Sequence, residues 1–116
     1  MAAAAIDMAA WDALSKAAGL PLARMLGAET RPIRAYNSTG LGLVTPDAAA
    51  VEAVELLEGG FGAIKMRLGR TDPKSDLAAV RAVRRAIPDH IMLMTDYNQA
   101  LSPAEALGRC RSLGKR

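Results

Sequence analysis

The feature that most constrains the fold is a repeat of one short apolar segment and one amphipathic helix, which occurs three times. The expected strands are residues 33–37, 61–68 and 91–95. Polar residues at equivalent places in the three segments, Tyr36, Lys65 and Asp96, lie 29 and 31 residues apart, which is the length of one strand–helix unit. Strands that alternate with single helices pair in parallel. The sequence therefore predicts an α/β fold with a parallel sheet, either closed into a barrel or open and doubly wound.

Residues that start or stop helices mark the helix ends. Each helix of the repeat begins with an N-cap residue and a proline at the first helical position, in Thr45-Pro46, Asp72-Pro73 and Ser102-Pro103. Ser102 and Glu105 also form the pattern of a capping box. The expected helices cover residues 2–18, 46–58, 73–87 and 103–113, with an additional turn at 22–26. From the apolar spacing, the expected inward-facing residues are Val51, Val54 and Leu57 in one helix and Leu77, Val80, Val83 and Ile87 in the next.

Charge and cysteine content exclude several classes of protein. Fifteen basic residues stand against twelve acidic ones. The basic excess lies mostly in Arg81, Arg84, Arg85, Arg109, Arg111, Lys115 and Arg116. Without stacking aromatic residues or a recognisable module, these charges indicate a solvated helix face and no nucleic-acid partner. The single cysteine, Cys110, allows no intrachain disulfide and fits a reducing, cytoplasmic location. We expect no signal peptide and no membrane partner, because no apolar run approaches about 18 residues.

Polar side chains gather where the three expected strands end. These residues are Tyr36 and Ser38, Lys65 and Arg67, and Asp96 and Asn98. In a parallel α/β protein the carboxyl ends of the strands lie together and carry the functional groups. We therefore expect these six side chains to lie near one another.

The second expected strand carries two cations on one of its faces. Side chains alternate along a strand, so Lys65 and Arg67 point one way, while Ile64, Met66 and Leu68 point the other. In a barrel the apolar set would face the helices and the cations would project into the mouth, where they need an anionic partner. The alternative is an edge strand whose two solvated cations block aggregation.

Asp96 follows an apolar run that is typical of a buried strand. A carboxylate at such a strand end can bind a hard cation through oxygen, or it can cap a turn. Two nearby features indicate less: His90 is expected in a loop, and Gly40-Leu41-Gly42 is too short to indicate a phosphate loop.

The sequence resembles the enolase superfamily, and within it the mandelate racemase and muconate lactonizing enzyme family, along almost its whole length. Residues 5–14 resemble the helix that leads into the barrel of that family, and residues 34–38 resemble its first strand. Residues 64–67 resemble its Lys-x-Lys strand, and residues 95–99 its first metal-ligand strand. The resemblance implies part of a (β/α)₈ TIM barrel. The expected domains are residues 1–30, a leading helix, and residues 31–116, the first three βα units.

The resemblance also implies a chemistry. Members of the family use Mg²⁺ to stabilise the enediolate that forms when the α-proton of a carboxylate is removed. Asp96 matches the first metal ligand, and Lys65 matches the lysine beside the substrate carboxylate. Tyr36, Ser38 and Asn98 match substrate-binding positions. The implied substrate is a small 2-hydroxy carboxylate, and the implied cofactor is Mg²⁺.

Arg67 departs from the family pattern, because racemases carry a second lysine there that acts as a base. A guanidinium stays protonated at any ordinary pH and is a poor base. It can clamp the substrate carboxylate, and its charge is expected to lower the pKa of Lys65. This change favours a dehydratase of hydroxy or sugar acids that uses one base over a racemase that uses two.

The chain supplies only three βα units, whereas a whole barrel needs about 250 residues. We therefore expect a fragment of such an enzyme that is inactive alone and binds Mg²⁺ weakly. Two alternatives remain: a non-catalytic truncated remnant, or a small complete parallel α/β binding domain. Three barrel strands leave unpaired edges and an uncovered face, so self-association or a homo-oligomer is expected.

Overall fold

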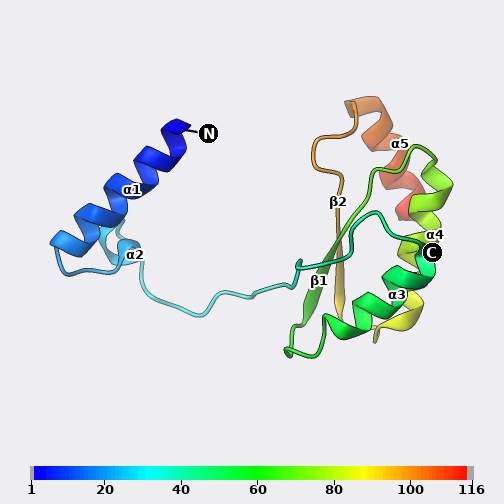
Figure 1. Cartoon of the computed structure of the whole chain (residues 1–116), viewed down its shortest axis with the longest axis horizontal. Coiled ribbons are helices and arrows are strands. Elements are labelled where there is room, and N and C mark those ends of the chain that lie inside the picture. The colour runs from blue at the N-terminus through cyan, green and yellow to red at the C-terminus, as the bar shows by residue number, and fades with distance from the viewer. Residues whose placement is uncertain (1, 115–116) are drawn as a thin grey trace. The chain divides into compact units, whose positions relative to one another are not determined.

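The chain alternates helices and strands in the order that the repeat predicts, with one element missing. The computed structural model describes residues 2–114. In chain order the elements are α1 (Ala2–Ala17), α2 (Leu22–Met25), α3 (Pro46–Glu55), β1 (Ala63–Arg67), α4 (Pro73–Ala86), β2 (Met92–Asp96) and α5 (Pro103–Leu113) (Figure 1). Residues up to Arg34 form one compact unit, and those from Ala35 onward form another. Lys115 and Arg116, which the sequence places in the basic group, lie outside the described residues.

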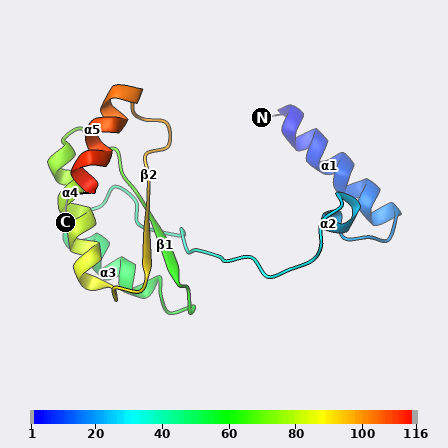
Figure 2. The ribbon, with the colours of Figure 1, turned by 180° about the vertical axis from the view of Figure 1, so that it is seen from behind.

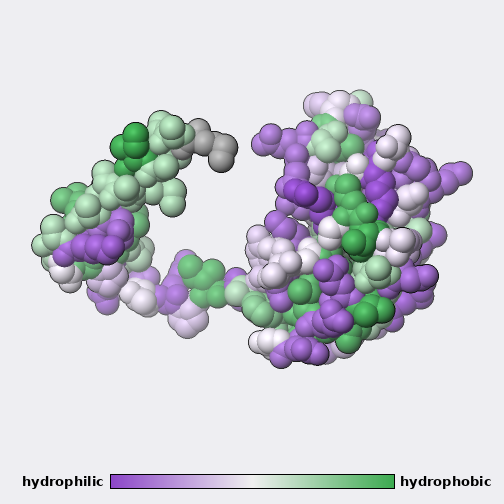
Figure 3. All heavy atoms as spheres, in the orientation of Figure 1, coloured by the Kyte–Doolittle hydropathy of each residue, from purple (hydrophilic) through white to green (hydrophobic). Residues whose placement is uncertain are grey.

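The first unit consists of α1 and the single turn of α2. Asp12 and Lys16 form the expected ion pair one helical turn apart, at 2.7 Å. Gly19 ends the helix with a φ of 65°, a left-handed conformation that glycine adopts without strain. Apolar side chains such as Ile6 and Leu14 are more than half exposed, and the face of this unit drawn in Figure 3 is mostly apolar. Within its own unit, this helix therefore leaves an apolar surface uncovered.

The second unit is built on two parallel strands. β1 pairs with β2 in a register that places Lys65 beside Met94 and Arg67 beside Asp96. The helices α3, α4 and α5 all lie on one side of this pair, as the two opposite views in Figures 1 and 2 show. The fold is thus a mixed α/β arrangement with a parallel sheet, as predicted, and its two strands end at the same edge.

The expected first strand, residues 33–37, is wrong except at its last residue. Only Asn37 pairs with β1, through an isolated parallel bridge to Ile64. Ile33 is 84% exposed, and residues 33–36 form no backbone hydrogen bond within the described part of the chain. A strand is stable only when its backbone groups are paired, so this segment stays extended without becoming part of the sheet. The chain then turns at Asn37, whose side chain accepts from the backbone N–H of Thr39 at 3.0 Å.

The core forms between the strands and α3 and α4. The largest fully buried side chains include Ile64, Met66 and Leu68 from β1 and its end, and Val83 from α4. The predicted alternation of β1 is therefore confirmed on its apolar face. As a group, the buried core residues are Leu41, Ala49, Ala53, Ile64, Met66, Leu68, Ala79, Val83, Ile87 and Ile91.

The inward face predicted for this helix is wrong at Val51 and Val54, whereas Leu57, just beyond α3, packs against the core as predicted. Val51 and Val54 are 62% and 50% exposed, whereas Ala49 and Ala53 are fully buried. Alanine has the smallest side chain that a helix can bury, so the alanine face lets α3 approach its neighbours closely. The valines then lie on a side that nothing in this unit covers. In α4 the prediction holds better, because Val83 and Ile87 are buried.

Two of the arginines predicted to lie on a solvated face have structural contacts instead. Arg84 donates to the backbone carbonyls of Ile87, Pro88 and Ile91, and so satisfies the acceptors where α4 ends. Arg109 donates to the carboxylate of Asp76 at 2.7 Å and to the backbone carbonyl of Arg70. Residue spacing did not reveal these contacts because the partners are backbone groups or residues far along the chain.

Asp76 is a buried carboxylate that fixes the loop after β1. Its side chain is only 1% exposed, and it accepts from the backbone N–H groups of Gly69 and Arg70. The guanidinium groups of Arg70 and Arg109 pair with its two oxygens at 3.2 and 2.7 Å. Arg70 also donates to the backbone carbonyl of Val44. One carboxylate therefore joins α4, α5 and two loops that border the strand ends.

We predict that Asp76→Asn lowers the free energy of unfolding by about 3 kcal/mol or more, because it leaves two half-buried guanidinium groups without their counter-ion. Urea denaturation followed by circular dichroism measures this loss. Asp89→Asn, at an exposed carboxylate, is the matched control and should change stability by less than about 0.5 kcal/mol. Equal effects of the two substitutions would contradict the role given to Asp76.

Candidate functional site

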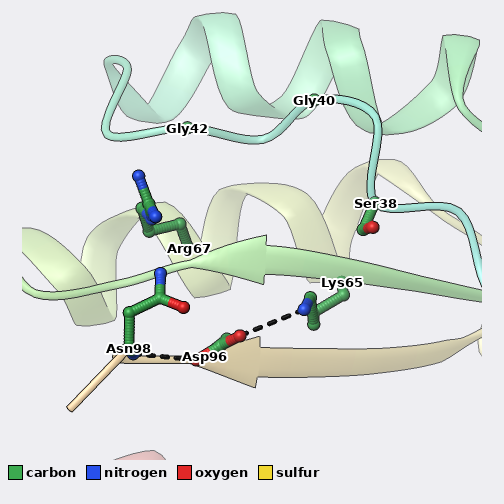
Figure 4. Close-up of a pocket in the computed structure, with 7 residues that line it drawn as sticks. All are labelled: Ser38, Gly40, Gly42, Lys65, Arg67, Asp96 and Asn98. Carbon is green, nitrogen blue, oxygen red and sulfur yellow. Dashed lines mark hydrogen bonds and ion pairs between the residues drawn. The ribbon is translucent and has the colours of Figure 1, made fainter. Parts of the chain in front are cut away.

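A pocket of about 250 Å³ lies where β1 and β2 end. Its lining comes from three segments: the loop after Asn37, the end of β1, and the end of β2 with the residues that follow. The lining residues are Ser38, Gly40, Gly42, Lys65, Arg67, Asp96 and Asn98 (Figure 4). Five of the six residues singled out from the sequence therefore line one pocket, and Tyr36 lies next to it, with its ring centre 5.4 Å from Lys65 Nζ.

The alternation of β1 sends its two cations to this pocket. Lys65 and Arg67 point away from the core side, which Ile64 and Met66 occupy with no exposed surface. The edge-strand alternative is wrong, because β1 bonds to β2 on one side and to Asn37 and Leu41 on the other. Lys65 is also not a free solvated cation, since it has an anionic partner.

That partner is Asp96. Lys65 Nζ lies 3.0 Å from Asp96 Oδ2, and the two side chains are 28% and 33% exposed. The pair joins the end of one strand to the end of the other across the pocket, as Figure 4 shows. The other carboxylate oxygen of Asp96 accepts from the backbone N–H of Asn98 at 2.8 Å. Both oxygens are thus held in a fixed direction.

These contacts shift the pKa values of Asp96 and Lys65. The backbone N–H of Asn98, followed by the Lys65 ammonium, holds the pKa of Asp96 below its usual range. The hydrogen bond to Asp96 raises the pKa of Lys65, with smaller contributions from Tyr36. The net change in the pKa of Lys65 is therefore opposite to the lowering expected from Arg67, because the Asp96 carboxylate lies within hydrogen-bonding distance of the ammonium.

Asn98 holds the end of Arg67. With its amide turned so that the oxygen faces the guanidinium, Asn98 Oδ1 accepts from Arg67 Nε and Nη2 at 2.6 and 2.8 Å. Asn98 has a φ of 46° and Gln99 a φ of 63°, so the chain leaves β2 in a left-handed turn. Asparagine tolerates this conformation better than most residues. The turn directs the Asn98 amide back toward β1, and Arg67 retains donors that face the pocket.

The metal-binding capacity of these residues is limited. Among residues 2–114 there is no group of three or more His, Cys, Asp or Glu side chains that could hold a metal ion. Mg²⁺ prefers oxygen ligands, and Asp96 offers one carboxylate whose oxygens already accept hydrogen bonds. The described residues on their own therefore do not fit a magnesium site, although Asp96 is chemically suited to be one ligand of a larger set.

Sequence reasoning missed the glycine loop. Gly40 and Gly42 line the pocket beside the two cations, and Leu41 between them is fully buried with a φ of 55°. The signal was present in Gly40-Leu41-Gly42, which is too short to indicate a phosphate loop. In the structure, Gly40 and Gly42 have no side chains, so the backbone of this loop forms one wall of the pocket.

No helix in the part of the chain that the structure describes is long and apolar enough to cross a membrane.

Two family models match the chain. The model described as "Enolase C-terminal domain-like" matches residues 48–115. The model described as "Mandelate racemase / muconate lactonizing enzyme, N-terminal domain" matches residues 1–27. The two matches occur in the order expected from the sequence.

Curated relatives include enzymes of several specificities. The L-talarate/galactarate dehydratase of Salmonella typhimurium is 42% identical over 95 residues, which are 81% of this chain and 24% of that protein. The hydrophobic dipeptide epimerase of Enterococcus faecalis is 36% identical over 110 residues, which are 95% of this chain and 30% of that protein. The chain thus spans about a quarter to a third of the length of these relatives.

Solved structures agree with the two family matches. An enolase with bound magnesium from alpha proteobacterium BAL199 is 45% identical with a TM-score of 0.79, over 93% of this chain and 31% of that one. An enolase from Bradyrhizobium in complex with magnesium and mandelic acid is 39% identical with a TM-score of 0.77, over 93% and 30%.

We predict that Lys65→Met raises the pKa of Asp96 toward its ordinary value without reaching it, because the hydrogen bond from Asn98 remains. A pH titration of the side-chain carboxyl ¹³C resonance measures this. Asp72, whose pKa is lowered by the backbone N–H of Lys74, is the internal control and should not move.

The lowered pKa of Asp96 determines the direction in which stability changes with pH. Its contribution to stability is present at neutral pH and is lost as the pH falls below the ordinary aspartate range and through the lowered value. An Asp96 titration that Lys65→Met leaves unchanged would contradict the ion pair.

Proposed function

The chain belongs to the mandelate racemase and muconate lactonizing enzyme family of the enolase superfamily, and we propose that it supplies the carboxylate-binding part of an active site that removes the α-proton of a 2-hydroxy acid. The observation that carries the proposal is the convergence of Lys65, Arg67 and Asp96 on one pocket. The proposal concerns a protein of the relatives' full length, of which this chain spans about a quarter to a third.

The pocket has the charge that a carboxylate requires. Asp96 balances Lys65, whereas the one partner of the Arg67 side chain among residues 2–114 is the neutral amide of Asn98. Arginine binds carboxylates through two parallel hydrogen bonds, so Arg67 is suited to hold the substrate carboxylate in one orientation. Ser38 and the backbone at Gly40 and Gly42 face the same space and would contact the remainder of a small hydroxy acid.

Each of these side chains has a role in the proposed reaction. A base that is not among these residues would take the α-proton. Its removal places negative charge on the substrate carboxylate, and Lys65 and Arg67 stabilise that charge where it develops. Asn98 positions Arg67 and would lie near the substrate hydroxyl, and Tyr36 lies against the Lys65 ammonium. Mg²⁺, with Asp96 as one of its ligands and the others outside the described residues, would act as the Lewis acid on the same carboxylate.

Arg67 favours dehydration over racemisation. A racemase that uses two bases needs a proton acceptor on each face of the substrate, and a guanidinium does not accept a proton at ordinary pH. A dehydratase needs one base and a leaving hydroxyl, so it tolerates arginine at this position. The L-talarate/galactarate dehydratase, at 42% identity, supports this choice.

We predict that the chain binds mandelate, the ligand of the Bradyrhizobium relative, and that Arg67→Met weakens binding about tenfold, equivalent to about 1.4 kcal/mol. Titration followed by ¹H–¹⁵N NMR measures the dissociation constant. Arg85→Met, at an exposed arginine of α4, is the control and should leave binding unchanged. Equal affinities of the two variants would contradict carboxylate binding by Arg67.

The reaction itself is tested in a chimaera in which residues 35–114 replace the aligned segment of the Salmonella typhimurium dehydratase. With Mg²⁺ present, the chimaera should exchange the α-proton of galactarate in D₂O, detected by ¹H NMR. Asp96→Asn should slow this exchange about a hundredfold or more, because it removes the carboxylate that pairs with Lys65 and that would be one ligand of Mg²⁺. The unmodified dehydratase is the positive control. A folded chimaera that exchanges no proton would contradict the proposal.

A further inference from the structure

A side chain outside the pocket determines the shape of one of its walls. The loop of residues 38–44 lies between α3 and β1, with Gly40 and Gly42 on the pocket side (Figure 4). On its other side, Glu52 of α3 reaches the loop, and its Oε2 accepts from the backbone N–H of Leu41 at 2.9 Å. Glu52 is half-buried and does not line the pocket.

Leu41 connects this carboxylate to β1. Its N–H donates to Glu52, and its carbonyl accepts from the backbone N–H of Arg67 at 2.9 Å. Its side chain is fully buried in the core, and its φ of 55° is a conformation that leucine rarely adopts. A strained conformation persists only where the surroundings hold it. For Leu41 these are the core around its side chain, Glu52 at its N–H and Arg67 at its carbonyl.

Gly40 lies so close to the Glu52 carboxylate that it leaves no room for a side chain. A β-carbon at Gly40 would lie 2.2 Å from Glu52 Oε1 and 2.7 Å from Glu52 Cδ, which no real contact allows. Any larger residue at Gly40 would push the end of the Glu52 side chain aside, and this movement would disturb its hydrogen bond to Leu41. Glycine at this position and glutamate on the helix therefore depend on each other.

From these contacts we propose that Glu52 is a positioning residue for the pocket. Its carboxylate holds Leu41 in the left-handed conformation, and this keeps the wall at Gly40 and Gly42 in place. Through the Leu41 carbonyl it also fixes the backbone of Arg67. The effect on ligand affinity rests on the proposed carboxylate binding, whereas the effect on the loop does not.

Amide hydrogen exchange in the full chain tests the proposal without reference to activity. In Glu52→Ala, exchange at the N–H groups of Leu41 and Arg67 should accelerate about tenfold or more, because a hydrogen bond to a charged acceptor is lost. Glu52→Gln keeps an acceptor oxygen and should give an intermediate rate. The control is Glu55→Gln, at an exposed glutamate of the same helix, which should leave both rates unchanged. Exchange at Val83 reports global stability and should change much less in all variants.

A double substitution separates this role from general stability. Gly40→Ala alone should accelerate exchange at Leu41 about as much as Glu52→Ala does, since it displaces the carboxylate. In the Glu52→Ala background, Gly40→Ala should add little, because the atoms that it would meet are gone. Additive effects of the two substitutions, or unchanged Leu41 exchange in Glu52→Ala, would overturn the proposal.

The mandelate titration distinguishes failure of this inference from failure of the proposed function. Glu52→Ala should raise the mandelate dissociation constant about threefold, although Arg67 itself is not substituted. Faster exchange at Leu41 with unchanged mandelate affinity would overturn the link to the pocket. Absence of mandelate binding in the unsubstituted chain would count against the proposed function and leave the exchange result to decide on Glu52.

Discussion

The site depends on the register in which β1 pairs with β2. Because side chains alternate along a strand, a shift of one residue in either strand would exchange its core face for its pocket face. The observed pairing of Arg67 with Asp96 keeps Ile64 and Met66 in the core and brings Lys65 within 3.0 Å of the Asp96 carboxylate. The same register therefore buries the apolar face of β1 and assembles the charged groups. A change of register would therefore disrupt the core and the charged site together.

Two carboxylates of the helices hold the loops that border this strand pair. Asp76 joins the loop after β1 to α5 through Arg70 and Arg109, and Glu52 holds the loop before α3. Both accept backbone N–H groups of loop residues, which would otherwise be poorly satisfied next to a core. The pocket thus has fixed walls on two sides, and preorganised donors stabilise developing charge without first having to reorient.

Much of this arrangement was predictable from the sequence. Helix starts with proline and an N-cap, the alternation of residues 63–68 and the polar residues at strand ends all correspond to what the structure has. Three features were not predictable, for physical reasons. The segment at 33–37 has strand-like residues but lacks a partner along most of its length. In α3 the alanine face is buried and the valine face is not, because alanines let the helix pack closer to its neighbours. The contacts of Glu52 and Asp76 depend on backbone positions that spacing does not specify.

The central claim is the register that places Lys65, Arg67 and Asp96 at one edge, and the most direct test is the scalar coupling that passes through a hydrogen bond. In the ¹⁵N,¹³C-labelled chain, the backbone nitrogen of Leu68 should couple to the carbonyl carbon of Asp96, and that of Met92 to the carbonyl of Gly62. Coupling of Leu68 to Thr95 or Tyr97 would reveal a register shifted by one residue. The cations and the carboxylate would then lie on opposite sides of the sheet, and the account of the site would be wrong.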